Sequence, residues 1–256
     1  MNTEILIVSF AKHFNHLIYA LRSIEKFARG FSAVRVVIPR VDIDRFSSEI
    51  SANIKREEGS CPVIVEGFDE WPDKGMVHHM HIIMHADQYC PDADFILHFD
   101  SDCTFTEPVT PEDYFLDGKP VLMYADFGWL CSSVQGNLIM WQEATLNAIG
   151  RPVEIETMRR HPAVHYRELY PLARDAIEKH TGKNMVEFMR EQRNEFPQSF
   201  CEYVTLGNVA WRTMRDKYHW RDQQSQGFPP SKLNQSWSHA DPGPDHMALY
   251  KKLGIT

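Results

Sequence analysis

The N-terminal part of the chain alternates between apolar runs and amphipathic stretches, and this alternation most restricts the possible folds. Near-continuous apolar runs at 4–10, 33–39 and 62–66 are typical of strands buried on both faces. Apolar residues at helical spacing predict a helix over 15–30, and a shorter helix is expected at 42–54. The order strand, helix, strand, helix, strand favours a parallel sheet with right-handed crossovers.

The rest of the chain continues this alternation less regularly. The pattern predicts a helix at 76–89, strands at 95–99 and 120–125, helices within 169–195 that are interrupted at 181–184, and a short helix at 245–253. We therefore expect an α/β fold, a three-layer α/β/α sandwich around a mostly parallel, Rossmann-like central sheet. We expect residues 1–256 to form a single domain, made of a first half at 1–105 and a second half at 106–256.

Two acidic residues, Asp100 and Asp102, directly follow the apolar run at 95–99. In an extended chain, positions two apart project to the same face, so both carboxylates can point at one spot. Two anions held so close repel each other unless a cation lies between them or one is protonated. Mg²⁺ and Mn²⁺ take carboxylate oxygens and often substrate phosphates as well. A metal–phosphate site at the carboxyl end of a strand is the sharper hypothesis, and a solvated turn is the alternative.

Other phosphate-binding devices are absent from the sequence. No G-x-G-x-x-G follows the first apolar run, and no G-x-x-x-x-G-K-[ST] occurs anywhere in the chain. Phosphate groups, if bound, are therefore not held by a Rossmann or P-loop motif.

Glu202 is a lone acid among aromatic and apolar residues. If it is buried, it needs a partner or carries a raised pKa, which is what a general base near neutral pH requires. A glutamate on a helix surface is the alternative interpretation.

Four histidines, His78, His79, His81 and His85, fall within the helix expected at 76–89. Histidines one helical turn apart can share a zinc ion, but the sequence lacks the H-E-x-x-H arrangement. The alternative is a polar helix edge. We expect His78 or His79 to face a bound substrate.

Three further stretches are candidates for ligand contacts. The segment 152–165 is rich in Arg and His, which indicates either a basic face for an anionic ligand or a solvated helix face. The aromatic residues within 126–141 suit an acceptor wall, although such residues also fill cores. The polar segment 223–244 carries Trp237 and His239, which favours an ordered loop that closes over a site.

Composition and charge exclude some classes of protein. The formal net charge of −8 argues against broad electrostatic attraction to nucleic acid or to an anionic membrane. No apolar run approaches the roughly 20 residues of a membrane span, so we expect no integral membrane segment. The five cysteines are scattered and suit reduced thiols. Because the N-terminus also lacks the basic region of a secretory signal, we expect a cytoplasmic protein.

The early α/β half, the apolar strand that ends in Asp100-Ser101-Asp102 and a late histidine together resemble the GT-A fold of nucleotide-sugar-dependent glycosyltransferases. The resemblance implies that Asp100 and Asp102 bind Mn²⁺ or Mg²⁺ on the donor diphosphate. It implies that Asp102 is a direct metal ligand, that Asp100 contacts the ribose or a metal-bound water, and that His239 is a third ligand. In this interpretation 1–105 is the donor half and 106–256 the acceptor half.

The same resemblance implies roles for several other residues. Ser9, Phe10 and Ala11 would hold the nucleobase and ribose, and Ser101 would also contribute to binding of the donor. Lys74, His78 and His79 are similar to a Gly-x-x-Gln-Gln-type segment of poorly characterised bacterial and phage members, with His in place of Gln. Phe200-Cys201-Glu202-Tyr203 is similar to an acidic segment of those members, which implies that Glu202 contacts the acceptor or serves as base.

These inferences lead to a metal-dependent glycosyltransferase with a UDP-sugar as the expected donor and a glycan or lipid-linked sugar as the expected acceptor. A phage-type DNA glycosyltransferase that acts on 5-hydroxymethyl pyrimidines is an alternative, as is a nucleotidyltransferase. A metal-dependent phosphohydrolase would carry its Asp-x-Asp after the first strand, where this chain has Ser9-Phe10-Ala11. A non-catalytic nucleotide- or sugar-binding module is the alternative from a different class.

Overall fold

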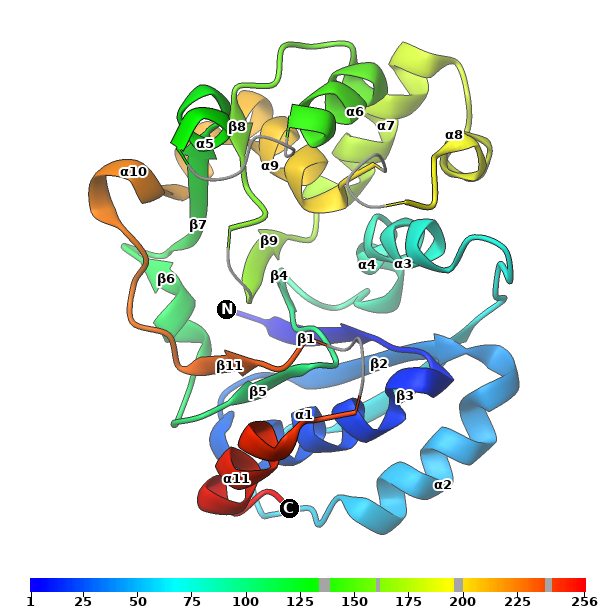
Figure 1. Cartoon of the computed structure of the whole chain (residues 1–256), viewed down its shortest axis with the longest axis vertical. Helices are drawn as coiled ribbons and strands as arrows, with labels where there is room; N and C mark the ends of the chain where they lie inside the picture. Colours follow the sequence, from blue (N-terminus) through cyan, green and yellow to red (C-terminus); the bar gives the residue numbers. More distant parts are fainter. Residues whose placement is uncertain (134–138, 160–161, 196–199, 238–240) are drawn as a thin grey trace.

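The central sheet of the protein has the strand order β3–β2–β1–β4–β9 (Figure 1). The structure is a computed structural model, and it describes residues 1–133, 139–159, 162–195, 200–237 and 241–256. The strands of this sheet are β1 (Thr3–Val8), β2 (Ala33–Pro39), β3 (Val63–Phe68), β4 (Phe95–His98) and β9 (Ala163–Tyr166). Strands β1 to β4 run parallel, and β9 pairs antiparallel with β4. The prediction of a mostly parallel sheet is confirmed.

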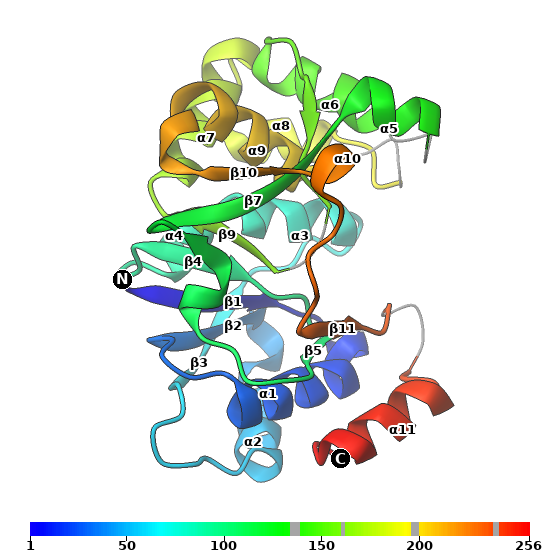
Figure 2. The same cartoon turned by 90° about the vertical axis from the view of Figure 1, so that its left-hand side faces the viewer.

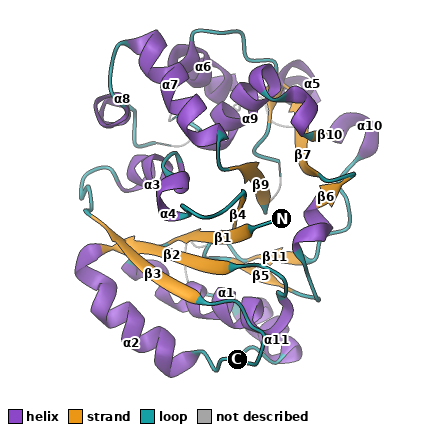
Figure 3. Cartoon of the chain, turned by 180° about the vertical axis from the view of Figure 1, so that it is seen from behind, coloured by secondary structure: helices purple, strands orange, loops and turns teal. Residues whose placement is uncertain are grey.

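Helices cover both faces of this sheet (Figures 1 and 3). One face carries α1 (Phe14–Phe27), α2 (Ile43–Asn53) and, beyond them, α11 (Pro244–Leu253). The opposite side of the molecule holds α3 (Gly75–Ile83), α4 (Ala86–Tyr89), α6 (Ile139–Ile149), α7 (Leu169–Thr181), α8 (Met185–Glu191) and α9 (Glu202–Thr213).

The residues of β1 show why the fold has three layers. Ile5 and Ile7 are fully buried in a hydrophobic cluster that includes residues of α1 and α2. Leu6 and Val8 belong to a second cluster, which includes residues of α3, α7 and α9. Because successive side chains of a strand point to opposite faces, a continuous apolar run supplies both clusters. The predicted α/β/α sandwich is therefore confirmed.

Smaller sheets complete the second half of the chain. One is formed by β7 (Lys119–Asp126) with its neighbours β6 (Phe115–Leu116), β8 (Ile155–Glu156) and β10 (His219–Asp222), and it lies near α5 (Phe127–Ser133) and α10 (Gln223–Gln226). Beyond α10 the chain returns to the first half, where β11 (Leu233–Gln235) pairs antiparallel with β5 (Cys103–Phe105) (Figure 2). The two halves therefore share strand pairing.

The helix expected at 76–89 is interrupted in the structure, so that prediction is wrong in its middle. The backbone N–H of His85 donates to the carbonyl of Ile82, three residues back. The carbonyl of His81, which a continuous helix would pair with that N–H, instead accepts from Nδ1 of the His85 ring at 2.9 Å. A side chain has taken the place of a backbone donor, and the helix ends there.

The interruption predicted at 181–184 is confirmed. Gly182 ends α7 in the left-handed conformation, at φ 69°, which costs glycine little. Asn184 then starts α8, and its side chain accepts a hydrogen bond from the backbone N–H of Glu187.

Candidate functional site

The carboxyl ends of β1 and β4 meet at the one place where the strand order reverses direction. Strand β1 lies between β2 and β4. After β1 the chain adds β2 and β3 on one side of it, and only later adds β4 on its other side. Ser9 to Ala11 follow β1, and Phe99 to Asp102 follow β4. Such a switch point is where open α/β sheets form a crevice for ligands.

A cavity of about 1020 Å³ opens at this point, and we call it the strand-end cavity. It is lined by Val8, Phe10, Ala11, Lys12, His13, Glu70, Pro72, Gly75, Met76, His79, Asp100, Ser101, Asp102, Asn194 and Asp241. The structure thus brings together six of the residues that the sequence analysis singled out: Phe10, Ala11, His79, Asp100, Ser101 and Asp102.

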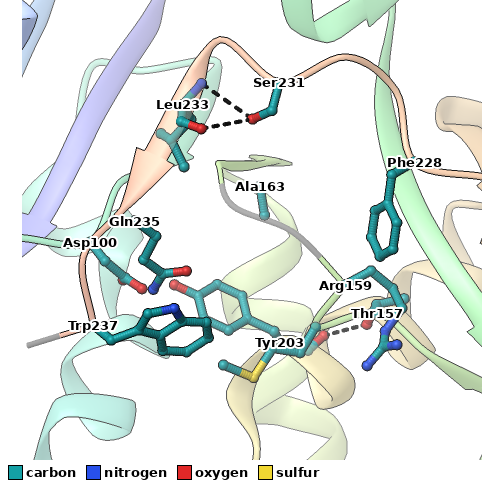
Figure 4. A pocket seen from close by; sticks show the side chains of 11 residues that line it. Asp100, Thr157, Arg159, Ala163, Tyr203, Phe228, Ser231, Leu233, Gln235 and Trp237 are labelled. Atoms are coloured by element: carbon teal, nitrogen blue, oxygen red, sulfur yellow. Dashed lines mark hydrogen bonds between the residues drawn. The ribbon is translucent and has the colours of Figure 1, made fainter. Parts of the chain in front are cut away.

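A second cavity of about 370 Å³ is also lined by Asp100, and we call it the aromatic cavity (Figure 4). It is lined by Asp100, Thr157, Met158, Arg159, Ala163, Tyr203, Phe228, Ser231, Leu233, Gln235 and Trp237. Asp100 is therefore part of the wall of both cavities.

The acidic pair lies in a tightly held turn. Asp102 is 7% exposed, and its backbone carbonyl accepts from the backbone N–H and the hydroxyl of Ser236, at 2.9 and 3.1 Å. Oδ1 of Asp102 accepts from Nε2 of Gln235 at 3.4 Å. The hydroxyl of Ser236 is also 3.0 Å from Nδ1 of His16 on α1. The C-terminal segment therefore braces the backbone and the carboxylate of Asp102.

The donor atoms at this turn suit a hard cation. Asp100, Asp102 and Cys103 each offer a ligand atom within 4.8 Å of the others, which no other three candidate ligands in the described part of the chain do. Burial and the two neighbouring carboxylates raise the pKa of the Cys103 thiol well above its usual value, so it stays a neutral thiol. The carboxylate oxygens that remain are the ligands that Mg²⁺ and Mn²⁺ prefer.

Glu202 is the first residue of α9 and is only 3% exposed. Burial raises its pKa to about 8, and the negative charge of Asp100 adds to this effect. Of the two alternatives for Glu202, a buried carboxyl with a raised pKa and a glutamate on a helix surface, the structure has the first. Glu202 is not among the described residues that line the two cavities, whereas Asp100 and Tyr203 are.

Three predicted contacts fall outside the strand-end cavity, as far as the described residues define its walls. Ser9 is fully buried, and its backbone N–H donates to the carbonyl of Val37. Nζ of Lys74 donates to the carbonyl of Gln192 at 2.7 Å. His78 is 3% exposed and its ring stacks on Trp71 at 4.4 Å, so of the two histidines expected to face a substrate only His79 lines the cavity. The stacking of the His78 ring on Trp71 holds this polar side chain in an apolar environment.

The remaining histidines give different outcomes. His81 and His85 lie beside one another with ring centroids 4.4 Å apart. In the described part of the chain, His78, His81 and His85 do not form a group of three ligand atoms within 4.8 Å, so the geometry gives no support to a zinc site. His239 lies outside the described residues.

The basic segment expected at 152–165 contains β8 and β9 rather than a helix, so the helix alternative is wrong. Within it, His165 is 1% exposed in the core. Arg159 forms an ion pair with the fully buried Glu156, and its Nη1 donates to Gln223 at 3.3 Å. Arg160 and His161 are not among the described residues. The described side chains of this segment therefore present no row of basic groups.

The described part of the segment 223–244, which was expected to be an ordered loop over a site, supplies five residues to the aromatic cavity: Phe228, Ser231, Leu233, Gln235 and Trp237. Tyr203 comes from another part of the chain and carries no motif that would join it to Phe228 and Gln235, so this grouping was missed. Asn194 was also missed, although its Oδ1 accepts from the backbone N–H groups of Met76 and Val77 at the start of α3. This cap across the cavity depends on tertiary structure alone.

The buried histidines should make the protein less stable in acid. Burial is the main cause that lowers the pKa of His78 to about 4 and that of His81 to about 3, and burial alone lowers that of His165 to about 3. In the unfolded chain they titrate near 6.5, so below that pH the unfolded state binds more protons than the folded state. We expect their stabilisation to be complete above pH 6.5 and to be lost, on the order of a few kcal/mol in total, as the pH falls through about 4.

Urea denaturation at pH 6.5, 5.5 and 4.5 measures this loss, and the His81→Phe variant is the matched test. Nε2 of His81 is buried without a hydrogen-bond partner in the described structure, so phenylalanine keeps the ring contacts and removes a titrating group. The variant should show a shallower loss of stability in acid. An unchanged slope would contradict the assignment.

The fold and the site define an α/β protein with two cavities that meet at an acidic strand end. A family model matches residues 14–241, and the chain belongs to this family, DUF6492, which is described as a family of unknown function. No curated protein matches the chain. Within the described residues, none of the helices is long and apolar enough to cross a membrane.

Proposed function

We propose that the protein is a metal-dependent glycosyltransferase, which moves a sugar from a nucleoside-diphosphate sugar, with UDP-sugars as the first candidates, to an acceptor hydroxyl. The observation that carries the proposal is that Asp100 lines both cavities. A transferase must hold two substrates so that their reacting atoms meet, and two cavities that share a carboxylate allow this.

The strand-end cavity is the proposed donor site. The nucleobase and ribose would lie against Phe10 and Ala11, and Lys12 supplies a positive charge for the diphosphate. Asp100 and Asp102 would hold Mn²⁺ or Mg²⁺, which would neutralise charge on the departing nucleoside diphosphate. A volume of about 1020 Å³ is ample for a ligand of this size.

The proposed third metal ligand is His239. Support comes from the residues on either side of the segment that contains it, since Trp237 lines the aromatic cavity and Asp241 lines the strand-end cavity. Oδ1 of Asp241 also accepts from Asn15, close to the start of α1.

The aromatic cavity is the proposed acceptor site. In the reaction, an acceptor oxygen forms a bond to the anomeric carbon of the donor sugar while the bond from that carbon to the diphosphate breaks. The proton of the acceptor hydroxyl passes to a carboxylate, and we assign this role to Glu202 because its raised pKa suits a proton acceptor near neutral pH. Because Glu202 lies behind the described cavity wall, the assignment requires that substrate binding brings its carboxyl to the acceptor.

The proposal includes a cytoplasmic location. Support comes from the cysteines, since all five are free thiols and four of them are buried. Free thiols persist in a reducing compartment.

Calorimetric titration of UDP, GDP and CDP, each with and without Mn²⁺, tests the donor site. We expect one nucleoside diphosphate to bind in the presence of Mn²⁺ and to bind at least tenfold more weakly without it. The Asp102→Ala variant should lose the effect of Mn²⁺, because a metal ligand is gone. The Asp175→Ala variant removes an exposed carboxylate of α7 and should behave as the wild type. If no nucleotide binds under any of these conditions, the transferase proposal fails.

A further inference from the structure

Two large aromatic side chains that line the aromatic cavity are exposed and are not packed in the core. Trp237 is 66% exposed and Phe228 is 44% exposed, and both line this cavity. Exposed aromatic rings that gather on one cavity are a usual sign of a ligand surface, because each ring offers a flat apolar face.

Trp237 also has an unusual backbone conformation. Its φ is 56°, in the left-handed region that bulky residues rarely adopt. Such strain persists where the surrounding structure imposes it, and it is concentrated at functional sites. The preceding residue, Ser236, is fixed by its hydrogen bonds to the carbonyl of Asp102. The chain therefore holds Trp237 beside the acidic pair at a cost to its backbone.

Polar groups surround the Trp237 ring at one end of the cavity. Figure 4 shows the carboxylate of Asp100, the amide of Gln235 and the hydroxyl of Tyr203 gathered near this ring. Burial raises the pKa of Tyr203 well above its usual value, so its hydroxyl stays neutral. The aromatic face suits a ligand with an apolar ring face. The carboxylate, amide and hydroxyl groups beside it can form hydrogen bonds to hydroxyl groups on the edge of that ring.

The charge of the cavity argues against an anionic ligand. Among the described residues of its wall, Arg159 is the only cation and is paired with the buried Glu156, while Asp100 is acidic. Arg167 follows β9, and its Nε donates to the carbonyl of Ala93 at 2.9 Å. Nucleic acids are bound chiefly through lysine and arginine on phosphates, and the described wall offers no such set.

We propose that the aromatic cavity binds a neutral pyranose unit of a glycan, with its apolar face on Trp237 and a hydroxyl group at Asp100. Its role as the acceptor rests on the proposed function, but the binding of a sugar does not. A volume of about 370 Å³ is near the lower end for small-molecule sites and suits a short carbohydrate rather than an extended polymer.

Titration with simple sugars tests this site directly. The probes are methyl glycosides of glucose, galactose, mannose and N-acetylglucosamine, added separately to the full chain and followed by ligand-observed NMR, with and without UDP and Mn²⁺. We expect at least one of them to bind with a Kd in the millimolar range. The Trp237→Gly variant should bind that sugar at least tenfold more weakly, and Trp237→Phe should stay within about threefold of the wild type, since a smaller ring still stacks.

The glycine variant separates binding from folding. Glycine adopts a positive φ without strain, so Trp237→Gly should melt no lower than the wild type. Failure of every sugar to bind the wild type, or unchanged binding by Trp237→Gly, would overturn the proposal. So would binding of a short DNA duplex that contains 5-hydroxymethylcytosine, if it is lost in Trp237→Gly.

A nucleotide titration on the same samples distinguishes the two proposals. Sugar binding without any nucleotide binding contradicts the glycosyltransferase and leaves the sugar site standing. Nucleotide binding without sugar binding contradicts the sugar site and leaves the proposed donor site standing.

Discussion

The Glu202→Gln variant should lose between about 10²- and 10⁴-fold of the turnover and keep the metal-dependent binding of the nucleotide, because it removes only the proposed proton acceptor. A base with a pKa of about 8 is mostly protonated at neutral pH. Wild-type turnover should therefore rise as the pH increases to about 8, and this rise should be absent from the residual activity of the variant. Initial rates between pH 6 and 9, with whichever sugar binds in the proposed titration as acceptor, measure both effects.

The same variant carries its own folding control. The folded state holds the proton of Glu202 up to about pH 8, whereas the unfolded chain releases it near 4.5. The raised pKa therefore contributes stability below pH 4.5 that is lost as the pH rises through about 8. Glutamine resembles the protonated form and does not ionise, so Glu202→Gln should be more stable than the wild type at pH 8.5. Turnover equal to the wild type would show that Glu202 serves the fold and not the reaction.

The Gly207→Ala variant should be destabilised by about 2 kcal/mol or more, which corresponds to a fall in Tm of roughly 4–8 °C. Gly207 lies in α9, and a Cβ atom there would stand 2.0 Å from Oγ1 of Thr157, 2.5 Å from its Cγ2 and 2.6 Å from its Cβ. Rotation of the Thr157 side chain cannot move its Cβ, so the backbone of that segment must shift. The gain in helix propensity from glycine to alanine, about 1 kcal/mol, offsets only part of the cost.

Gly75→Ala is the matched control for this prediction. Gly75 is the first residue of α3, and a Cβ atom there would meet nothing within 4 Å. Its Tm should stay within about 2 °C of the wild type, since a substitution that touches nothing has little effect. Equal melting of Gly207→Ala and wild type would mean that α9 and the Thr157 segment are less closely packed than described.

The sequence predicts most of the sheet and half of the site, for physical reasons that differ between them. The strands of the first half are buried on both faces, and such runs are recognisable without tertiary information. Asp100 and Asp102 were found because the strand and the turn after it are contiguous in sequence. Phe10 and Ala11 came instead from the resemblance to the GT-A fold, which implies that the end of the first strand holds the nucleobase and ribose.

What the sequence could not predict depends on contacts between distant segments. For the aromatic residues within 126–141 both an acceptor wall and the core were open, and Trp141 lies in the core. Trp237, in the segment expected to close over a site, lines the aromatic cavity together with Phe228. No local pattern separates these cases, because aromatic residues have the same composition signal in a core and in a cavity. The sequence also left His78 and His79 as alternatives, since only the position of His78 against Trp71 shows that His78 is the buried one.

The pairing of β5 with β11 has a consequence for synthesis of the chain on the ribosome. The turn with Asp100 and Asp102 emerges early, but its adjoining strand β5 gains its partner only when Gln235 has left the exit tunnel. Contacts between residues so far apart in sequence form late in folding. A nascent chain that stalls before β11 therefore carries a complete acidic turn without the segment that braces it, and it should be recognised by chaperones and proteases as an unfinished product.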